Sequence, residues 1–241
     1  MALVVWVYAG GGESEVVGLI PFLQQNLPRC TFERKLPIRR KPGPRPDVHI
    51  PAYGSTGKSL IDQIKNSISK HWDDAVDIVI VMDDSDDKSP TEREHALQQA
   101  IVGSLSARQV DISTGKPIVT VSLAVPEIET WLLADWDSTF AKEFGDCQSA
   151  AKHEVSKRGL KFSAPESFEV VDKDGGYRKI SEVLQSVLAD KCGVRYSKAT
   201  DTPRLLGLIN PTTVSRKCPY FNKFWQVLKP LCGAPSKGAR A

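Results

Sequence analysis

Continuous runs of apolar residues recur along the first half of the chain and predict buried strands. The three clearest runs are Leu3–Ala9, Ile78–Met82 and Ile118–Val125. Each is uninterrupted rather than alternating with polar residues, which is typical of a strand buried on both faces of a parallel sheet. A segment with apolar positions at helical spacing follows each run. This strand–helix order implies right-handed crossovers, so we expect an α/β fold with a central, mostly parallel sheet.

The other elements of the first half follow from the same two periodicities. Thr31–Ile38 has the pattern of a further strand. Thr91 followed by Glu94 matches a capping box at the start of a helix. The expected helices are Glu15–Asn26, Ser59–Trp72, Thr91–Ala107 and Glu127–Ala134.

Strand signals fade after about residue 135, and helical patterns remain. Amphipathic spacing predicts helices at Tyr177–Lys191, Pro203–Ile209 and Tyr220–Leu228. The last residues are small and polar. We therefore predict an α/β domain over residues 1–135, a helical lobe packed on it over residues 136–232, and a disordered tail over residues 233–241.

Acidic residues follow each of the three apolar strands. The carboxyl ends of parallel strands lie along one edge of the sheet, where ligands bind, so carboxylates that are far apart in sequence can converge there. A purely oxygen ligand set favours Mg²⁺, Mn²⁺ or Ca²⁺ over zinc. The alternative is a solvated acidic loop that caps the next helix. The residues concerned are Glu13, Glu15, Asp83, Asp84, Asp86, Asp87, Glu127 and Glu129.

Charge adds one further candidate, although the net charge of +3 is itself weak evidence about partners. Residues 34–45 carry several Lys and Arg side chains and no acid. Within this segment Arg39, Arg40 and Lys41 could form an arm that contacts phosphates of a nucleic acid. The segment is also rich in proline, so a solvated loop is the competing interpretation.

Cysteine usage and hydropathy bear on the compartment. The five cysteines show no CxxC motif and no even disulfide pattern, which fits structural thiols in a reducing compartment. The apolar N-terminus lacks the basic flank of a signal peptide. No segment approaches the length of a transmembrane helix. We therefore expect a cytoplasmic protein that does not associate with membranes.

The sequence argues against several other catalytic chemistries. The four histidines are not at zinc-ligand spacing, and no GxSxG element is present. The segment Ala52–Ser59 resembles a P-loop, but Ala52 stands where a glycine is needed and prolines interrupt the preceding residues. We interpret it as a glycine-rich turn that caps the next helix. Lys58 in this turn could contact a substrate phosphate.

Several segments together resemble a known family. The segments are GGGESE (Gly10–Glu15), YGSTGKS (Tyr53–Ser59), VIVMDDSDD (Val79–Asp87), VPEIETWLLAD (Val125–Asp135), YSKATDTPRLLGLI (Tyr196–Ile209) and CPYFNKFWQVL (Cys218–Leu228). The most specific of them is PEIETWLLAD. A buried first strand, a glycine turn with an acidic residue and a later strand ending in DxD form the Toprim pattern, and the whole chain to about Leu228 is similar to the Toprim-like domain-of-unknown-function family 4276.

The resemblance implies a Rossmannoid fold and a nuclease that needs Mg²⁺ or Mn²⁺ and cleaves DNA or RNA. Similar proteins often sit beside ATPases of the ABC or overcoming-lysogenization-defect (OLD) type, in gene pairs thought to defend bacteria against phage. The partner expected for this chain is therefore such an ATPase. The metal ligands of Toprim nucleases carry over to Asp84 and Asp86, with Asp83 in the alternative register.

One position departs from the family pattern. A glutamate usually precedes the first glycine of the turn, and here that place holds Ala9, or Gly11 in the other plausible register. Glu13 or Glu15 can substitute, because each is only a few residues away. Otherwise the protein is a catalytically degenerate binding or scaffold subunit of the ATPase assembly.

These observations give a leading hypothesis of metal-dependent phosphodiester hydrolysis, in which paired metals activate water. The expected metal ligands are Glu15, Asp84 and Asp86, and Glu13 is the candidate general base. Glu127 and Glu129 would supply a further ligand or support the ligands. The expected phosphate-binding residues are Lys58, Arg39, Arg40 and Lys41.

Overall fold

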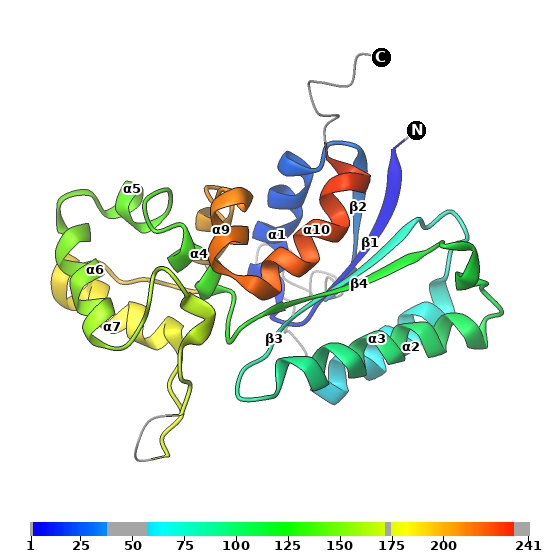
Figure 1. Cartoon of the computed structure of the whole chain (residues 1–241), viewed down its shortest axis with the longest axis horizontal. Coiled ribbons are helices and arrows are strands. Elements are labelled where there is room, and N and C mark those ends of the chain that lie inside the picture. The colour runs from blue at the N-terminus through cyan, green and yellow to red at the C-terminus, as the bar shows by residue number, and fades with distance from the viewer. Residues whose placement is uncertain (1, 38–56, 172–174, 234–241) are drawn as a thin grey trace, which may run out of the picture.

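The central element of the structure is a parallel sheet. A computed structural model of the chain describes residues 2–37, 57–171 and 175–233. Within these residues, the strands lie in the order β2-β1-β3-β4, and every neighbouring pair is parallel (Figure 1). The predicted α/β class with a parallel sheet is confirmed. The strands are β1 (Leu3–Ala9), β2 (Cys30–Leu36), β3 (Ile78–Asp84) and β4 (Ile118–Ala124).

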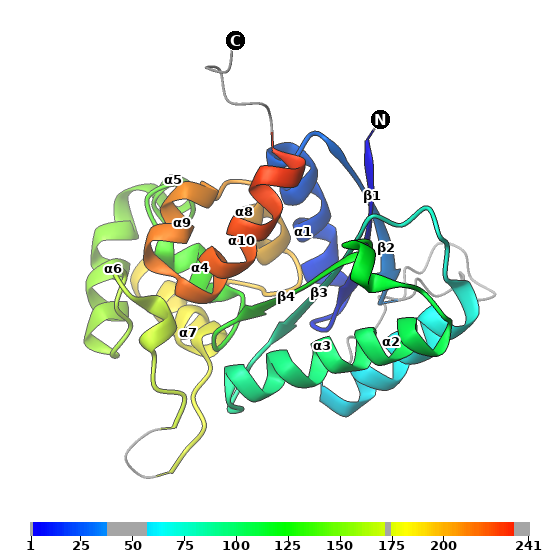
Figure 2. The same ribbon diagram turned by 45° about the vertical axis from the view of Figure 1, so that its right-hand side comes forward.

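Helices cover both faces of this sheet. On one face lie α2 (Gly57–His71) and α3 (Pro90–Ala107), and on the other lie α1 (Glu13–Asn26) and α10 (Pro219–Cys232), as Figures 1 and 2 show. Because the central strand β3 is buried along its whole length, its residues can be apolar on both faces, and this explains the uninterrupted run in the sequence.

Side chains along β3 alternate between the two apolar cores. Val79 and Val81 belong to the core under α2 and α3, whereas Ile80 and Met82 belong to the core under α1 and α10. The same alternation, which has a period of two residues in any strand, sends neighbouring residues at the end of β3 to opposite sides of the sheet.

The helical part lies beyond the carboxyl ends of β3 and β4 (Figures 1 and 2). It shares one continuous apolar core with the α1 and α10 face of the sheet. Close contact is possible because Gly18 of α1 has no side chain, as a Cβ there would lie 2.5 Å from the Cα of Pro203. The helices of this part are α4 (Glu129–Ala134), α5 (Phe140–Phe144), α6 (Gln148–Lys157), α7 (Ile180–Cys192), α8 (Asp201–Leu206) and α9 (Pro211–Lys217). Short 3₁₀ turns occur at Ile112–Thr114, Gly145–Cys147 and Pro165–Ser167.

The structure corrects some local predictions. The short helices α5, α6 and α9 were not predicted, because each buries only one or two apolar residues, too few for a periodicity to show. The expected capping box at Thr91 is also wrong. Helix α3 is capped by Ser89, whose Oγ accepts a hydrogen bond from the backbone amide of Glu92 at 3.4 Å. Pro90 takes the first helical position, which proline favours, so the cap must precede it.

Four of the five cysteines form disulfides, which corrects the expectation of unpaired thiols. Cys30 pairs with Cys232, and Cys147 pairs with Cys192. The partners are 202 and 45 residues apart in sequence, so their spacing gave no sign of the pairing. Cys218 keeps a buried free thiol. Among the described residues, no helix combines the length and the apolar composition needed to cross a membrane.

The division into residues 1–135 and 136–232 stays a prediction, because the two parts share the core described above. Asp135 at the expected boundary is itself buried, and its Oδ2 accepts a hydrogen bond from the backbone amide of Asn210 at 2.7 Å. Residues 234–241 of the expected tail lie outside the described residues.

Candidate functional site

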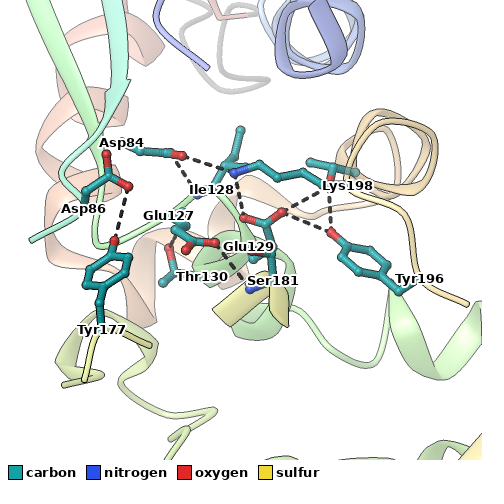
Figure 3. Close-up of polar contacts among 11 residues, drawn as sticks. Asp84, Asp86, Glu127, Ile128, Glu129, Thr130, Tyr177, Ser181, Tyr196 and Lys198 are labelled. Atoms are coloured by element: carbon teal, nitrogen blue, oxygen red, sulfur yellow. Dashed lines mark hydrogen bonds and ion pairs between the residues drawn. The ribbon is translucent and has the colours of Figure 1, made fainter. Parts of the chain in front are cut away.

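Asp84 ends β3 on the side of the sheet that faces the helical part. Its Oδ1 accepts a hydrogen bond from the backbone amide of Ile128 at 3.1 Å. Its Oδ2 lies 3.3 Å from the Nζ of Lys198, and both contacts are visible in Figure 3. The carboxylate is therefore fixed between the loop that follows β4 and a lysine from the turn before α8.

Glu129, the first residue of α4, contacts the same lysine. Its side chain is fully buried, and its Oε1 accepts hydrogen bonds from the hydroxyl groups of Tyr196 at 3.2 Å and Thr202 at 3.3 Å. Its Oε2 lies 3.5 Å from the Nζ of Lys198 but makes no hydrogen bond (Figure 3). One ammonium group thus lies between carboxylates that come from β3 and α4.

Glu127 adds a third buried carboxylate to this group. It is 2% exposed, and its Oε2 accepts a hydrogen bond from the backbone amide of Ser181, at the start of α7 (3.3 Å). Burial raises the pKa of Glu127 above its usual range, and the neighbouring charge of Glu129 raises this pKa further, while Lys198 opposes both effects. We call Asp84, Glu127 and Glu129 the carboxylate centre.

Asp86 lies at the rim of the centre, in the loop after β3. Its backbone has a φ of 50°, in the left-handed region that aspartate tolerates better than most residues. Its amide donates to the carbonyl of Pro126 at 3.0 Å, which holds the loops after β3 and β4 side by side. The hydroxyl of Tyr177 donates to Oδ1 of Asp86 at 3.3 Å (Figure 3). The two acids of the DxD motif are thus near each other but have different partners.

Asp83 faces the opposite side of the sheet, as the alternation along β3 requires. Its Oδ2 accepts hydrogen bonds from the guanidinium of Arg93 in α3, including one from Nε at 2.7 Å. Burial raises the pKa of Asp83 to about 6, although Arg93 acts against this shift. The alternative metal register through Asp83 therefore lies on a different face from the carboxylate centre.

The remaining predicted site residues are only partly described. The amide of Gly10 donates to the carbonyl of Met82 at 2.8 Å, so the start of α1 lies at the same sheet edge as the end of β3. Helix α1 begins at Glu13, but the side chains of Glu13 and Glu15 lie outside the described part of the structure. Lys58 is exposed in the first turn of α2. Arg39, Arg40 and Lys41 also lie outside the described residues.

Comparison with known proteins identifies the family. The family model described as Domain of unknown function (DUF4276) matches residues 13–229. The chain belongs to this family. No curated protein and no solved structure matches the chain. The match to DUF4276 covers the carboxylate centre, Lys198 and most of the helical part, so these features lie within the family's own domain.

The sequence did not point to the residues of the helical part that complete the site of this DUF4276 protein. Lys198, Tyr196 and Thr202 come from the segment Tyr196–Thr202, and Ser181 comes from the start of α7. The separations from their acidic partners reach 114 residues, so no local spacing could connect them. Two signals marked this segment as a whole: the polar composition of YSKATDT ahead of a helix, and its place among the segments that resemble the family.

The described residues contain no group of three or more His, Cys, Asp or Glu side chains arranged to enclose a metal ion. The oxygen donors at the centre instead converge in pairs on Lys198. Chemically, the arrangement offers hard anionic oxygens, one carboxyl group whose pKa is raised by burial, and one ammonium group that reaches them from a partly exposed position.

Proposed function

We propose that this chain is a Toprim-like phosphodiester hydrolase that depends on Mg²⁺ or Mn²⁺ and acts on DNA or RNA. The observation that supports this most directly is the pairing of Asp84 and Glu129 around one cation. Glu129 Oε2 is buried without a hydrogen bond, and it points to the same ammonium as Asp84 Oδ2. A buried acceptor without a hydrogen bond is costly and needs an explanation, and at Glu129 the explanation that we propose is a further cation, because a second carboxylate and an ammonium lie beside it.

The donor set fits a hard divalent cation. Carboxylate oxygens are the ligands that Mg²⁺ and Mn²⁺ prefer, and Asp84 and Glu129 would hold the ion. Asp86 at the rim, and Glu13 and Glu15 at the start of α1, are the further candidates at this edge. A bound divalent ion would supply a water of lowered pKa and would neutralise charge on the phosphate oxygens.

The residues of the chain itself have separate roles in this proposal. Glu127 would carry a proton, because its raised pKa favours the protonated form and the amide of Ser181 fixes its position. Lys58 in α2, and Arg39, Arg40 and Lys41 in the arm predicted from the sequence, would bind the phosphate backbone of the substrate.

The resemblance to Toprim-like proteins further suggests the effector role in a bacterial anti-phage system, with an ABC/OLD-type ATPase as partner. The proposed compartment is the cytoplasm. Cytoplasmic thiol systems keep most cysteines reduced. In that compartment the pairs Cys30–Cys232 and Cys147–Cys192 would therefore be mostly reduced, and the fold would have to tolerate the dithiol state.

A second candidate function is a non-catalytic subunit of the same assembly. The observation that favours it is that Lys198 already neutralises part of the charge of the centre. In this alternative the ammonium is a permanent counter-ion, the acids are structural, and partner binding belongs to the helical part.

A cleavage screen separates the two functions. The purified chain, with and without the ATPase, is incubated with plasmid, single-stranded DNA and transfer RNA in Mg²⁺ or Mn²⁺. For the hydrolase we expect cleavage that Glu129→Gln reduces by about 100-fold or more, because the loss of one ligand can remove most of the metal affinity or activity. Asp87→Asn is the matched control, since Asp87 is exposed in the same acidic loop and pairs only with Lys88 among the ion pairs of the described residues. Cleavage in neither metal, with or without the ATPase, supports the non-catalytic subunit.

A further inference from the structure

The most unusual feature of the carboxylate centre is the lysine that reaches into it. We infer that Lys198 is an exchangeable counter-ion, which occupies the centre until a divalent ion displaces it and which therefore sets the metal affinity of the site. This inference rests on the proposed function, because it assigns the regulation of the same site.

The distances place one ammonium where two carboxylates meet. Nζ of Lys198 lies 3.3 Å from Asp84 Oδ2 and 3.5 Å from Glu129 Oε2. The side chains of the two acids are 10% and 0% exposed, whereas that of the lysine is 32% exposed. The ammonium therefore enters from the solvent side, and its departure would open the oxygens of both acids to an incoming ion.

Among the described residues, the charges of the centre do not balance. The centre holds the carboxyl groups of Asp84, Glu127 and Glu129, all of which are buried, and the ammonium of Lys198 supplies a single positive charge. Burial of carboxylates without matching cations is strongly unfavourable. A divalent ion neutralises one charge more than an ammonium does, so the exchange would bring the centre closer to neutrality.

The ammonium of Lys198 leaves part of the hydrogen-bonding capacity of the carboxylate centre unused. Glu129 Oε2 is buried and makes no hydrogen bond, although Lys198 is 3.5 Å away. Its other oxygen, Oε1, accepts two hydrogen bonds from Tyr196 and Thr202. The carboxylate is thus held in place by Oε1, while Oε2 keeps its capacity for a closer cation.

The local backbone allows the lysine side chain to move while its neighbours stay fixed. Tyr196 is fully buried, and the amide of Ser197 donates to Asp201 Oδ2 at 2.7 Å. The amide of Asp201 donates in turn to the carbonyl of Ser197 at 2.8 Å. The flexible four-carbon stem of Lys198 could rotate without a change in these backbone contacts, and rotation of a partly exposed side chain is a fast and local motion.

Metal titration of variants tests the exchange. Mn²⁺ binding is measured from the electron paramagnetic resonance signal of the free ion for wild type and Lys198→Met. A unit charge at this range changes carboxylate equilibria by about 10- to 1000-fold, so Lys198→Met should bind Mn²⁺ at least about 10-fold more tightly. The control is Lys179→Met, because Lys179 is exposed and lies 5.9 Å from the Tyr177 ring. The control should change the affinity less than about two-fold, as expected for a screened surface charge. Equal or weaker binding by Lys198→Met overturns the inference.

A second measurement does not depend on the folding of that variant. Wild-type protein carrying lysine labelled with ¹³C at Cε is titrated with Mg²⁺, and the Lys198 resonance is assigned through Lys198→Arg. The exchange predicts that this resonance moves toward that of a solvated lysine as the ion binds. Mg²⁺ binding that leaves the resonance unchanged overturns the inference.

The outcomes separate the inference from the proposed function. Tighter Mn²⁺ binding by Lys198→Met without cleavage of any nucleic acid would support the exchange and refute the hydrolase. Metal-dependent cleavage, with no effect of Lys198→Met on the Mn²⁺ affinity, would support the hydrolase and refute the exchange. If neither wild type nor Lys198→Met binds Mn²⁺ at millimolar concentration, both are wrong.

Discussion

Asp83 and Asp84 are neighbours at the end of β3, yet they face opposite sides of the sheet and have different charged partners there. On the α2 and α3 side, Asp83 meets one guanidinium, that of Arg93, and the pair is one charge against one. On the other side, Asp84 shares the ammonium of Lys198 with Glu129, and Glu127 lies close by. In the part of the chain that the structure describes, the first arrangement is balanced, whereas the second has more carboxyl groups than cations.

This difference shows how an ion pair that only stabilises the fold can be distinguished from a candidate ligand site. A buried pair with matched charges can hold two elements together without any ligand, and Asp83–Arg93 ties β3 to α3 in this way. The contrast lies in the charges, because Asp83 Oδ1, like Glu129 Oε2, is buried without a hydrogen bond. Carboxylates that outnumber their cations leave charge for something else to neutralise. The acid that deserves mutagenesis as a ligand is therefore Asp84, although the sequence offered both.

Removal of Arg93 should lower the unfolding free energy more than removal of Lys198. Arg93→Met leaves the fully buried Asp83 without its partner, and loss of one member of a buried pair costs about 3–5 kcal/mol of unfolding free energy. Lys198→Met should cost less, because the lysine side chain is 32% exposed whereas that of Arg93 is 13% exposed. Urea denaturation at pH 7 in EDTA measures both values. Equal costs would remove the distinction between the two sides.

The pH dependence of stability should contain a contribution from Asp83. Its pKa is about 6 in the folded protein, above the ordinary aspartate value, so between pH 4 and 6 the folded state binds a proton that the unfolded state has released. Stability should therefore fall as pH rises through this window, by up to about 3 kcal/mol from this group. Asp83→Asn should remove that part of the fall. Urea midpoints of wild type and variant at pH 4, 5, 6 and 7 test this, and parallel curves would contradict it.

On the side of the carboxylate centre, Tyr196→Phe should lower the unfolding free energy less than Arg93→Met does. The variant deletes the hydroxyl that donates to Glu129 Oε1 at 3.2 Å and lies 2.6 Å from Thr202 Oγ1. Loss of one partner of a buried charged group costs about 1–3 kcal/mol. A double-mutant cycle with Thr202→Val should show coupling, because both hydroxyls contact the same oxygen. Strictly additive losses would mean that the two hydroxyls do not act on Glu129 together.

The smallest change in unfolding free energy is expected at Asp86, at the rim of the carboxylate centre. Tyr177→Phe removes a 3.3 Å hydrogen bond to Asp86 from a side chain that is 40% exposed. Exposed substitutions of this kind change the unfolding free energy by about 0.5 kcal/mol or less. Thermal unfolding of the variant in EDTA measures the change. A loss above about 1 kcal/mol would show that Asp86 belongs energetically with the buried centre, contrary to the 0.5 kcal/mol limit expected at the surface.

The sheet could be predicted because its signal is local. A strand buried on both faces must be apolar throughout, so Leu3–Ala9 was found with its correct limits. The acids at the end of β3 were located for the same reason, since the apolar run stops at Asp83. The opposite orientation of Asp83 and Asp84 also follows from the two-residue period of a strand.

The cationic half of the site could not be predicted. Lys198 meets Asp84 across 114 residues, and this contact depends on how the helical part packs against the sheet. Packing of short helices is decided by tertiary contacts rather than by periodicity. Cys30 and Cys232 illustrate the same limit, because only the complete fold brings the end of α10 next to the start of β2.

The position of α10 has a consequence for how the chain reaches its fold during synthesis. This helix packs on β4, yet it is synthesised after every other described helix and strand of the sheet and the helical part. Until α10 has been synthesised, α1 covers only part of the apolar face that it shares with α10, so the nascent chain exposes a surface that chaperones recognise and that aggregates readily. Coverage of this face by α10, and with it the approach of Cys232 to Cys30, is therefore a late event, and contacts between residues so far apart in sequence slow folding.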